Sequence, residues 1–267
     1  MMLIEKEPNA KTVAKYVDRY QVFMIDEPAF LKTIPNGKID CYLVKKGSFS
    51  RWDEETGTFV SNSLSGVLPA TNSTSYYHIP NSLLCLNIKL KLNVLSLSIF
   101  NEYSTNRDNF EVANLISEAE QKSILSKIDE DNPDIAVDDL DNIIESALQQ
   151  SSIDERMDRV IELIEHRITS KFKVAELASA LHMTEKSMSR WIKKQFNMTP
   201  KELWQIIRFE NVSHTLKAEP DRNHADSLEF GYYDQSHFIK ECRKITGYSP
   251  KAFFSKMKLS TNDVIFE

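Results

Sequence analysis

Cysteine and glycine are both scarce in this sequence, and their scarcity excludes several classes of site. The three cysteines, Cys41, Cys85 and Cys242, lie far apart, are odd in number and lack the close spacing of zinc ligands. We therefore predict neither a disulfide framework nor a metal centre. Only six glycines are present, which leaves little material for a phosphate-binding loop, and the G-x-S-x-G and H-E-x-x-H motifs are absent. These absences argue against an enzyme, and no cofactor is expected.

Long apolar runs are also missing. The N-terminal MMLIEKEPNAK contains two acidic and two basic residues and lacks a long apolar core, and no segment approaches the roughly 20 apolar residues of a membrane span. With 41% hydrophobic and 27% charged residues, the composition is that of a soluble globular protein. We expect a cytoplasmic protein, and its 267 residues suffice for two domains that each bury a core.

Charge is divided unevenly along the chain. The net charge of −6 is unfavourable for a protein that binds phosphate-rich partners. However, residues 1–150 contain 14 Lys and Arg against 22 Asp and Glu, whereas residues 171–258 contain 16 against 10. The first segment is acidic and the second is basic. We therefore predict two domains with different electrostatic roles, residues 1–150 and 151–258, followed by a tail of residues 259–267.

The first hundred residues have the pattern of a β-rich domain. Strand-forming runs alternate with turn residues; the runs are Tyr20–Ile25, Ile39–Val44 and Leu83–Leu92, and the turns include Gly37, Gly47 and Gly57. Between Cys85 and Leu92, apolar residues alternate with Asn87, Lys89 and Lys91, which predicts one buried and one solvated face. We expect an antiparallel sheet or barrel from about Tyr16 to Phe100.

Helical periodicity replaces the strand pattern after residue 110. We predict helices over residues 110–128, 137–149 and 153–169, of which the last has the clearest apolar stripe. The first two helices either cover the core of the β-rich domain or form a dimerisation surface. The sequence leaves both interpretations open.

A pair of short helices is predicted next. Four apolar residues have the spacing of a first helix: Val174, Leu177, Ala178 and Leu181. After a short turn, Thr184 is a suitable N-cap for a second helix from Glu185 to about Gln195. That helix has Met188 and Ile192 on one side, and a mainly basic row on the other, formed by Lys186, Ser189, Arg190 and Lys193. Two such helices are typical of a helix-turn-helix.

A second unit of the same kind is predicted around FGYYDQSHFIKECRKITGYSP, residues 230–250. Asp234 is an N-cap, and the apolar positions of the helix that follows are Phe238, Cys242 and Ile245. Its opposite face is mainly polar, with Gln235, Ser236, Ile239, Lys240 and Arg243. Gly247 ends this helix and Pro250 starts another. A short helix near residues 225–229 precedes the unit, and Pro200 begins a long helix that links the two units as a rigid spacer.

Residues 153–258 resemble the DNA-binding domain of the AraC/XylS family of bacterial transcriptional regulators. The resemblance rests on AELASALHMTEKSMSRWIKKQFNMTP, on Arg208 in the linking helix and on GYYDQSHFIKECRKITGYSP. In that family, the second helix of each unit enters the major groove. By position, the resemblance implies base or phosphate readers at Lys186, Ser189, Arg190, Gln235, Ser236, His237 and Lys240. It also implies phosphate contacts at Lys193, Lys194, Arg243 and Lys244.

The sequence departs from the family pattern in two places. Asn197 replaces a common glycine, and His224 replaces a common isoleucine under the second unit. Four acids near the second unit oppose phosphate: Glu219, Asp221, Asp226 and Glu229. We therefore expect the first unit to contribute more of the DNA affinity. The alternative function is a ligand-sensing or protein-interaction module with weakened DNA binding.

The N-terminal half resembles, more weakly, the cupin-like sensor domains of such regulators. The expected fold class is α+β, a cupin-like β-rich domain followed by an all-α domain with two helix-turn-helix units joined by a long helix. The resemblance implies double-stranded DNA as a partner and control by a small effector or by self-association as a homodimer. It also implies RNA polymerase as a partner if the protein is an activator.

No residue of an effector site is identified by the sequence. His78 is the single histidine in the first 150 residues, so a multi-histidine metal site is not available there. We interpret His78 as a partly exposed structural residue, with a pocket residue as the alternative. Seven aromatic residues pack in the core or line an effector pocket: Tyr16, Tyr20, Tyr42, Trp52, Phe59, Tyr76 and Tyr77.

Overall fold

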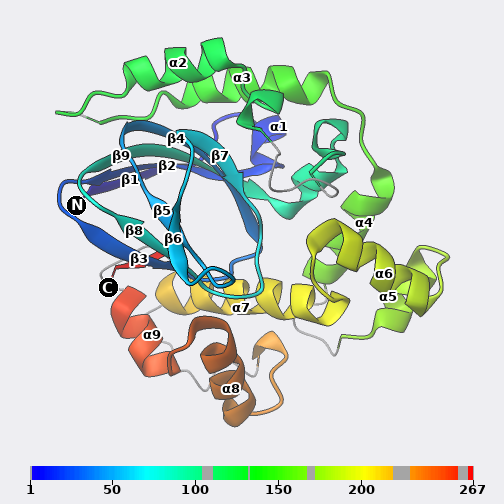
Figure 1. Cartoon of the computed structure of the whole chain (residues 1–267). Helices are drawn as coiled ribbons and strands as arrows, with labels where there is room; N and C mark the ends of the chain where they lie inside the picture. The colour runs from blue at the N-terminus through cyan, green and yellow to red at the C-terminus, as the bar shows by residue number, and fades with distance from the viewer. Residues whose placement is uncertain are drawn as a thin grey trace. The chain divides into compact units, whose positions relative to one another are not determined.

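The computed structural model describes residues 2–103, 111–131, 133–166, 172–218, 229–257 and 264–266, which form two compact units (Figure 1). Unit 1 consists of Met1–Phe30, Lys38–Pro69 and Tyr76–Glu155. Unit 2 consists of Leu31–Gly37, Ala70–Ser75 and Arg156–Glu267. Two short segments of the N-terminal half therefore belong to the unit that contains the helix-turn-helix sequences.

Unit 1 is built on a five-stranded antiparallel sheet with the order β1-β2-β9-β4-β7. Its strands are β1 (Met2–Lys6), β2 (Val17–Ile25), β9 (Leu83–Lys91), β4 (Lys38–Gly47) and β7 (Ser65–Leu68). The three predicted strands correspond to β2, β4 and β9. A hairpin of β5 (Ser50–Asp53) and β6 (Thr58–Ser61) turns at Gly57, and β5 also pairs with β8 (Ser75–Ile79). The β-rich, cupin-like architecture is confirmed.

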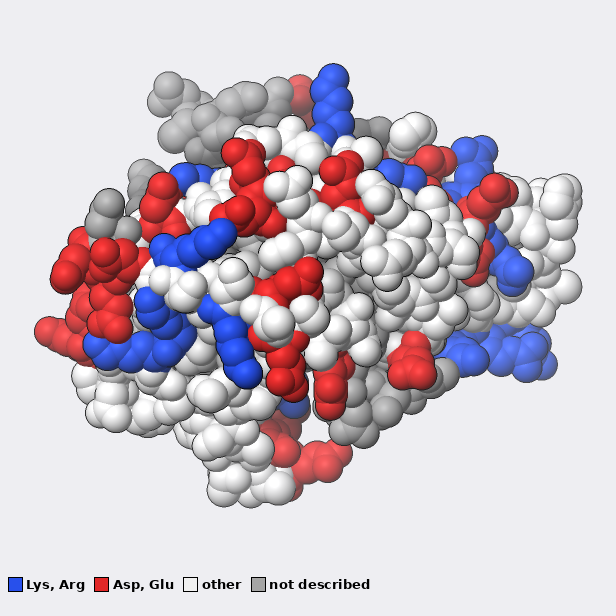
Figure 2. Space-filling view, turned by 90° about the horizontal axis from the view of Figure 1, so that it is seen from above, with Lys and Arg blue, Asp and Glu red and all other residues white. Residues whose placement is uncertain are grey.

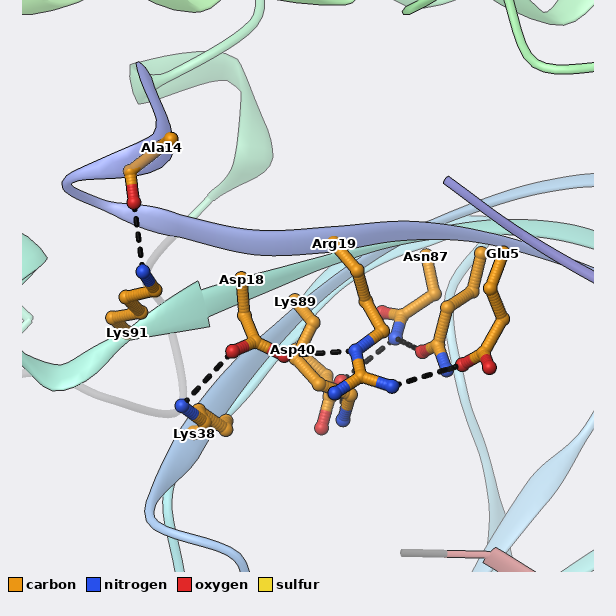
Figure 3. Close-up of polar contacts among 10 residues, drawn as sticks. Glu5, Ala14, Asp18, Arg19, Lys38, Asp40, Asn87, Lys89 and Lys91 are labelled. Carbon is orange, nitrogen blue, oxygen red and sulfur yellow. Dashed lines mark hydrogen bonds and ion pairs between the residues drawn. The ribbon is translucent and has the colours of Figure 1, made fainter. Parts of the chain in front are cut away.

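The prediction that one face of β9 is solvated is wrong. Asn87 and Lys89 are only 7% and 4% exposed. Lys89 Nζ donates to Asp40 Oδ1 at 2.7 Å, and Asn87 Nδ2 donates to the same oxygen at 2.7 Å and to Gln21 Oε1 at 2.9 Å. Figure 3 shows Asp40, Asn87 and Lys89 grouped along neighbouring strands. Both faces of β9 are therefore buried, and the Asn87 NH2 group and the Lys89 ammonium are bonded to side chains of neighbouring strands, whereas Asn87 Oδ1 has no hydrogen-bond partner among the described residues.

Asp18 on β2 extends this polar network. Its carboxylate accepts hydrogen bonds from Arg19 Nε at 2.8 Å and from Lys38 Nζ at 3.1 Å (Figure 3). Burial by itself would raise the pKa of Asp18, but the charges and hydrogen bonds of Lys38 and Arg19 outweigh it and lower the pKa to about 2. Asp18 therefore stabilises the folded sheet in its ionised form.

Helices α1 (Lys11–Ala14), α2 (Glu118–Lys127) and α3 (Val137–Gln149) belong to unit 1, and α2 and α3 lie over one face of its sheet (Figure 1). The predicted helix over residues 110–128 is wrong in extent. Val112–Asn114 forms a separate 3-10 turn, η4, and α2 begins only after Ser117, which makes a reciprocal capping box with Glu120. Residues 104–110 lie outside the described part.

Helix α3 has its predicted limits, and one of its faces packs on the core of unit 1. Its apolar side chains Val137, Leu140 and Ile144 are buried. The carboxylate of Asp141 accepts hydrogen bonds from Tyr20 Oη at 2.6 Å and from the Ala10 N–H at 2.7 Å. This face of α3 is therefore core cover. Figure 2, which views the molecule from above α2 and α3, shows acidic side chains spread over the surface on this side.

Unit 2 is helical. Its helices are α4 (Glu155–Glu165), α5 (Val174–Ala180), α6 (Glu185–Phe196), α7 (Pro200–Ala218), α8 (Gln235–Thr246) and α9 (Pro250–Met257). Helix α4 is shorter than the predicted helix over residues 153–169. Ile153 is 50% exposed and precedes α4 in a single antiparallel bridge to Leu97, and the part from residue 167 lies outside the described residues.

The core of unit 2 surrounds the second half of α7. It contains buried residues of α7, α8 and α9, together with residues outside these helices: Ile34, Phe209, Val212, Leu216, Tyr232, Phe238, Cys242, Ile245, Phe253 and Ile265. Ile265 lies in β10 (Val264–Phe266), which pairs antiparallel with Leu31–Thr33 at the end of β3 (Ala29–Thr33). Among all the described helices, none is both long and apolar enough to cross a membrane.

Candidate nucleic-acid interface

The first helix-turn-helix is formed by α5 and α6, as predicted. Leu177 and Ala178 of α5 are buried, and so are Met188, Ile192 and Phe196 of α6. The side chain of Thr184 accepts a hydrogen bond from the Ser187 N–H at 3.2 Å and so caps the start of α6. The turn between the helices contains His182 at φ 53°, a left-handed conformation. These contacts fix α6 with one face in the core.

The opposite face of α6 carries the predicted contact residues. Lys186, Arg190, Lys193 and Lys194 are exposed, and Ser189 is half-buried. Lys193 Nζ donates to the Asn197 backbone carbonyl at 2.8 Å, which holds it near the C-terminal end of the helix. Asn197 has φ 56°, so it fills the left-handed C-cap position where the family commonly has glycine. The structure thus places four cations on or beside one helix face.

Helix α7 follows directly from this unit and carries Arg208. Thr199 and Glu202 form a capping box at its start, with the Thr199 N–H donating to Glu202 Oε2 at 2.8 Å and Glu202 N–H donating to Thr199 Oγ1 at 3.2 Å. Pro200 occupies the first helical position, as predicted. The helix runs to Ala218 and joins the first unit to the sequence before α8.

Arg208 is completely buried and is held by charge and by aromatic rings. Its Nη2 lies 2.5 Å from Glu241 Oε2 and its Nε donates to Glu241 Oε1 at 3.2 Å. The guanidinium carbon lies 4.0 Å from the centre of the Trp204 ring and 3.9 Å from that of Tyr232. Tyr232 Oη donates to Glu241 Oε1 at 2.6 Å. This buried pair attaches α8 to α7.

Helix α8 is the second predicted recognition helix. Asp234 Oδ1 accepts a hydrogen bond from the His237 N–H at 2.7 Å, and Gly247 at φ 79° ends the helix. Its buried face includes Phe238, Cys242 and Ile245, as predicted. The helix that was predicted near residues 225–229 lies almost wholly outside the described residues, as do His224, Glu219, Asp221 and Asp226.

The outer face of α8 presents most of the residues that the resemblance implied. Gln235, Ser236, Lys240, Arg243 and Lys244 are all exposed on this side. His237 is half-buried, and its ring packs edge-on against Tyr232 with 5.3 Å between the ring centres. His237 Nδ1 also accepts the Tyr233 N–H at 3.4 Å. His237 therefore contacts the start of its own helix, whereas the other five side chains face outward.

Glu241 is the ion-pair partner of Arg208, and it was not identified from the sequence. It lies three residues after Phe238 and immediately before Cys242, so helical spacing places it on the buried face of α8. An acid at such a position requires a buried partner, and Arg208 is a cation on an otherwise apolar side of α7. Two opposite charges at positions with the spacing of buried faces could therefore have predicted the ion pair from the sequence.

Candidate effector residues in unit 1 do not form one group. Tyr16, Tyr20, Tyr42 and Tyr77 are buried, whereas Trp52, Phe59 and Tyr76 are exposed. His78 is half-buried and stacks on Phe30 with 4.6 Å between the ring centres. A pocket of about 570 Å³ includes only Tyr42 of the seven aromatic residues, and its lining is mainly polar. Within the described residues, no cluster of three or more His, Cys, Asp or Glu could hold a metal ion.

Comparison with known proteins gives matches to most of the chain and to a part of its second half. A family model described as a helix-turn-helix domain matches residues 177–256. The transcriptional activator PerA of Escherichia coli O127:H6 is 22% identical over 236 residues, which cover 88% of this chain and 66% of PerA. The chain thus spans just under two thirds of the length of this curated relative.

Solved structures of ToxT from Vibrio cholerae share the fold. An apo form of a ToxT single-residue variant has a TM-score of 0.53 at 17% identity, covering 94% of this chain and 99% of ToxT. A second ToxT structure has a TM-score of 0.54 at 10% identity, covering 88% and 97%. ToxT with a bound unsaturated fatty acid has a TM-score of 0.50 at 12% identity, covering 87% and 93%. The helix-turn-helix match and the two-domain fold shared with ToxT agree with the resemblance of residues 153–258 to the AraC/XylS family.

Proposed function

We propose that this protein is a sequence-specific DNA-binding transcriptional regulator. In this proposal, residues 151–258 bind double-stranded DNA through α6 and α8, and residues 1–150 control that binding. The observation that carries it is the repeated construction of α6 and α8, each with an apolar face in a core and cations on the outer face. A helix that enters the major groove presents side chains in this way.

The candidate DNA-contact residues are expected to have two different roles. Lys186, Ser189 and Arg190 on α6, and Gln235, Ser236 and Lys240 on α8, are expected to reach base edges or nearby phosphates. His237 belongs to the same group by position. The exposed cations nearer the helix C-termini, Lys193, Lys194, Arg243 and Lys244, are expected to contact phosphates.

The test is selection of duplexes from a randomised DNA library by the full-length protein, followed by footprinting of the enriched sequence. We expect one enriched motif with two protected segments about one helical turn, roughly 34 Å, apart on one face of the DNA. Recovery of no enriched sequence, with binding no tighter than to random duplex, would contradict the proposal and favour the interaction-module alternative.

Control by the N-terminal domain is part of the same proposal. ToxT of Vibrio cholerae has been solved with an unsaturated fatty acid bound, so oleate is the first effector to test here. The footprint is repeated with and without oleate, and a change in DNA affinity is expected. Sedimentation of the full-length protein tests whether it forms a homodimer, and transcription with purified RNA polymerase tests whether it activates.

A further inference from the structure

The residue just before the N-cap of α8 has an unusual environment. Tyr233 is 85% exposed, and the next most exposed large apolar side chain in the described residues, Leu64, is 67% exposed. Single exposed aromatic residues are common on proteins, so exposure alone has no functional meaning. The position of Tyr233 beside the outer face of α8 is what requires an explanation.

The backbone on both sides of Tyr233 is fixed. Tyr232 is 4% exposed, and its hydroxyl donates to buried Glu241 at 2.6 Å. The Tyr233 N–H donates to His237 Nδ1 at 3.4 Å, and Asp234 caps α8 by accepting the His237 N–H at 2.7 Å. Neighbours on either side are thus anchored to the core or to the helix. Tyr233 is held facing outward at little cost in backbone entropy on binding.

We propose that Tyr233 is a further DNA contact whose hydroxyl donates a hydrogen bond to a phosphate oxygen at the edge of the groove that α8 enters. This inference rests on the proposed DNA-binding function. Tyr233 precedes the helix, beside exposed Gln235 and Ser236, so it lies at the end of the row expected to reach the bases. The N-cap Asp234 is acidic and its carboxylate accepts the His237 N–H, but the first turn that follows contains no acidic residue, and the N-terminal end of a helix favours a negative group. Tyrosine hydroxyls are among the side-chain groups that contact DNA phosphates and fix register.

The first helix-turn-helix lacks an equivalent contact. Met183 stands before its N-cap, and the first turn of α6 contains Glu185, which would repel a phosphate. Tyr233 therefore gives the second unit a neutral anchor that the first unit does not have. The Tyr233 contact would add DNA affinity without adding a cation.

The experiment measures DNA binding by Tyr233→Phe and Tyr233→Ala in the full-length protein, using the duplex enriched by wild-type protein. We expect Tyr233→Phe to weaken binding about ten- to hundredfold, because one hydrogen bond to a charged group is lost. The loss should be similar for duplexes with single base changes, and the salt dependence should be unchanged because no cation is removed. Lys244→Gln should instead reduce the salt slope by about one. Leu64→Ala, at another exposed large apolar side chain that belongs to unit 1, is the control for Tyr233→Ala.

Three results would overturn the proposal. Binding by both Tyr233 variants within twofold of wild type would remove Tyr233 from the interface. A loss confined to one base position would make Tyr233 a base reader and not a phosphate contact. If wild-type protein enriches no duplex at all, the proposed function itself fails, and that failure is visible before any variant is tested.

Discussion

Replacing Arg208 with methionine should destabilise unit 2 more than removal of any exposed cation. Methionine keeps much of the side-chain volume but removes the charge that faces Glu241, which is 4% exposed. Breaking a buried ion pair by removing one partner costs about 3–5 kcal/mol, because the remaining charge is left uncompensated. The variant also lacks the contacts that the Arg208 guanidinium makes with the ring faces of Trp204 and Tyr232. We expect a loss of about 3–5 kcal/mol in the free energy of unfolding.

A double variant separates the charge effect from general disruption. Arg208→Met combined with Glu241→Leu leaves no unpaired charge, although Tyr232 Oη and Gln205 Nε2 lose their acceptor. Its loss should be about 1–3 kcal/mol, which is the cost of leaving such polar groups without a partner and is less than the loss for Arg208→Met alone. The measurement is urea unfolding of the full-length protein followed by far-UV circular dichroism.

Arg159→Met is the matched control for this comparison. Arg159 makes an ion pair with Glu162 at 3.2 Å on α4, but both side chains are 57% exposed. An exposed pair of this kind contributes at most about 0.5 kcal/mol. A loss below about 1 kcal/mol for Arg208→Met, or a double variant that is less stable than Arg208→Met, would refute the argument from an uncompensated buried charge.

Three further predictions concern DNA contacts, pH and backbone geometry. Arg190→Ala should cost about 1–3 kcal/mol in DNA affinity and relax the preferred sequence, whereas Lys194→Gln should weaken binding to all duplexes evenly and lower the salt slope by about one; equal effects on all duplexes for Arg190 would contradict its role as a base reader. Because the folded pKa of Asp18 is lowered from 3.8 to about 2, its stabilising effect is complete above pH 3.8 and is lost as the pH falls through about 2. Asp18→Asn should therefore lower stability by about 2 kcal/mol at pH 7 in urea unfolding, and an undiminished difference near pH 2 would count against this assignment. Gly47→Ala should unfold at lower temperature than wild type by several degrees, because a Cβ there would lie 1.9 Å from a backbone oxygen, whereas Gly57→Ala meets nothing within 4 Å and should lose only what its positive φ costs.

The sequence by itself determined the local construction of the DNA-binding helices. Apolar spacing predicted the buried faces of α6 and α8, and the caps Thr184, Asp234 and Gly247 were identified by residue type. These features depend on residues within one or two turns of each other, so the sequence contains the whole interaction. Strands β2, β4 and β9 were predicted from strand-forming runs bounded by turn residues, which are also local features.

Only the tertiary structure decided which distant residues meet. Lys89 was predicted to face solvent, yet it is buried because β9 lies between β2 and β4, where Asp40 accepts its hydrogen bond. Glu241 was missed because its partner, Arg208, is 33 residues away on another helix. Ile34 belongs to the core around α8 although it comes from the β-rich half of the sequence. The partner of a buried charge or of an apolar face is set by long-range packing, and a periodic pattern specifies that a face is buried without specifying what covers it.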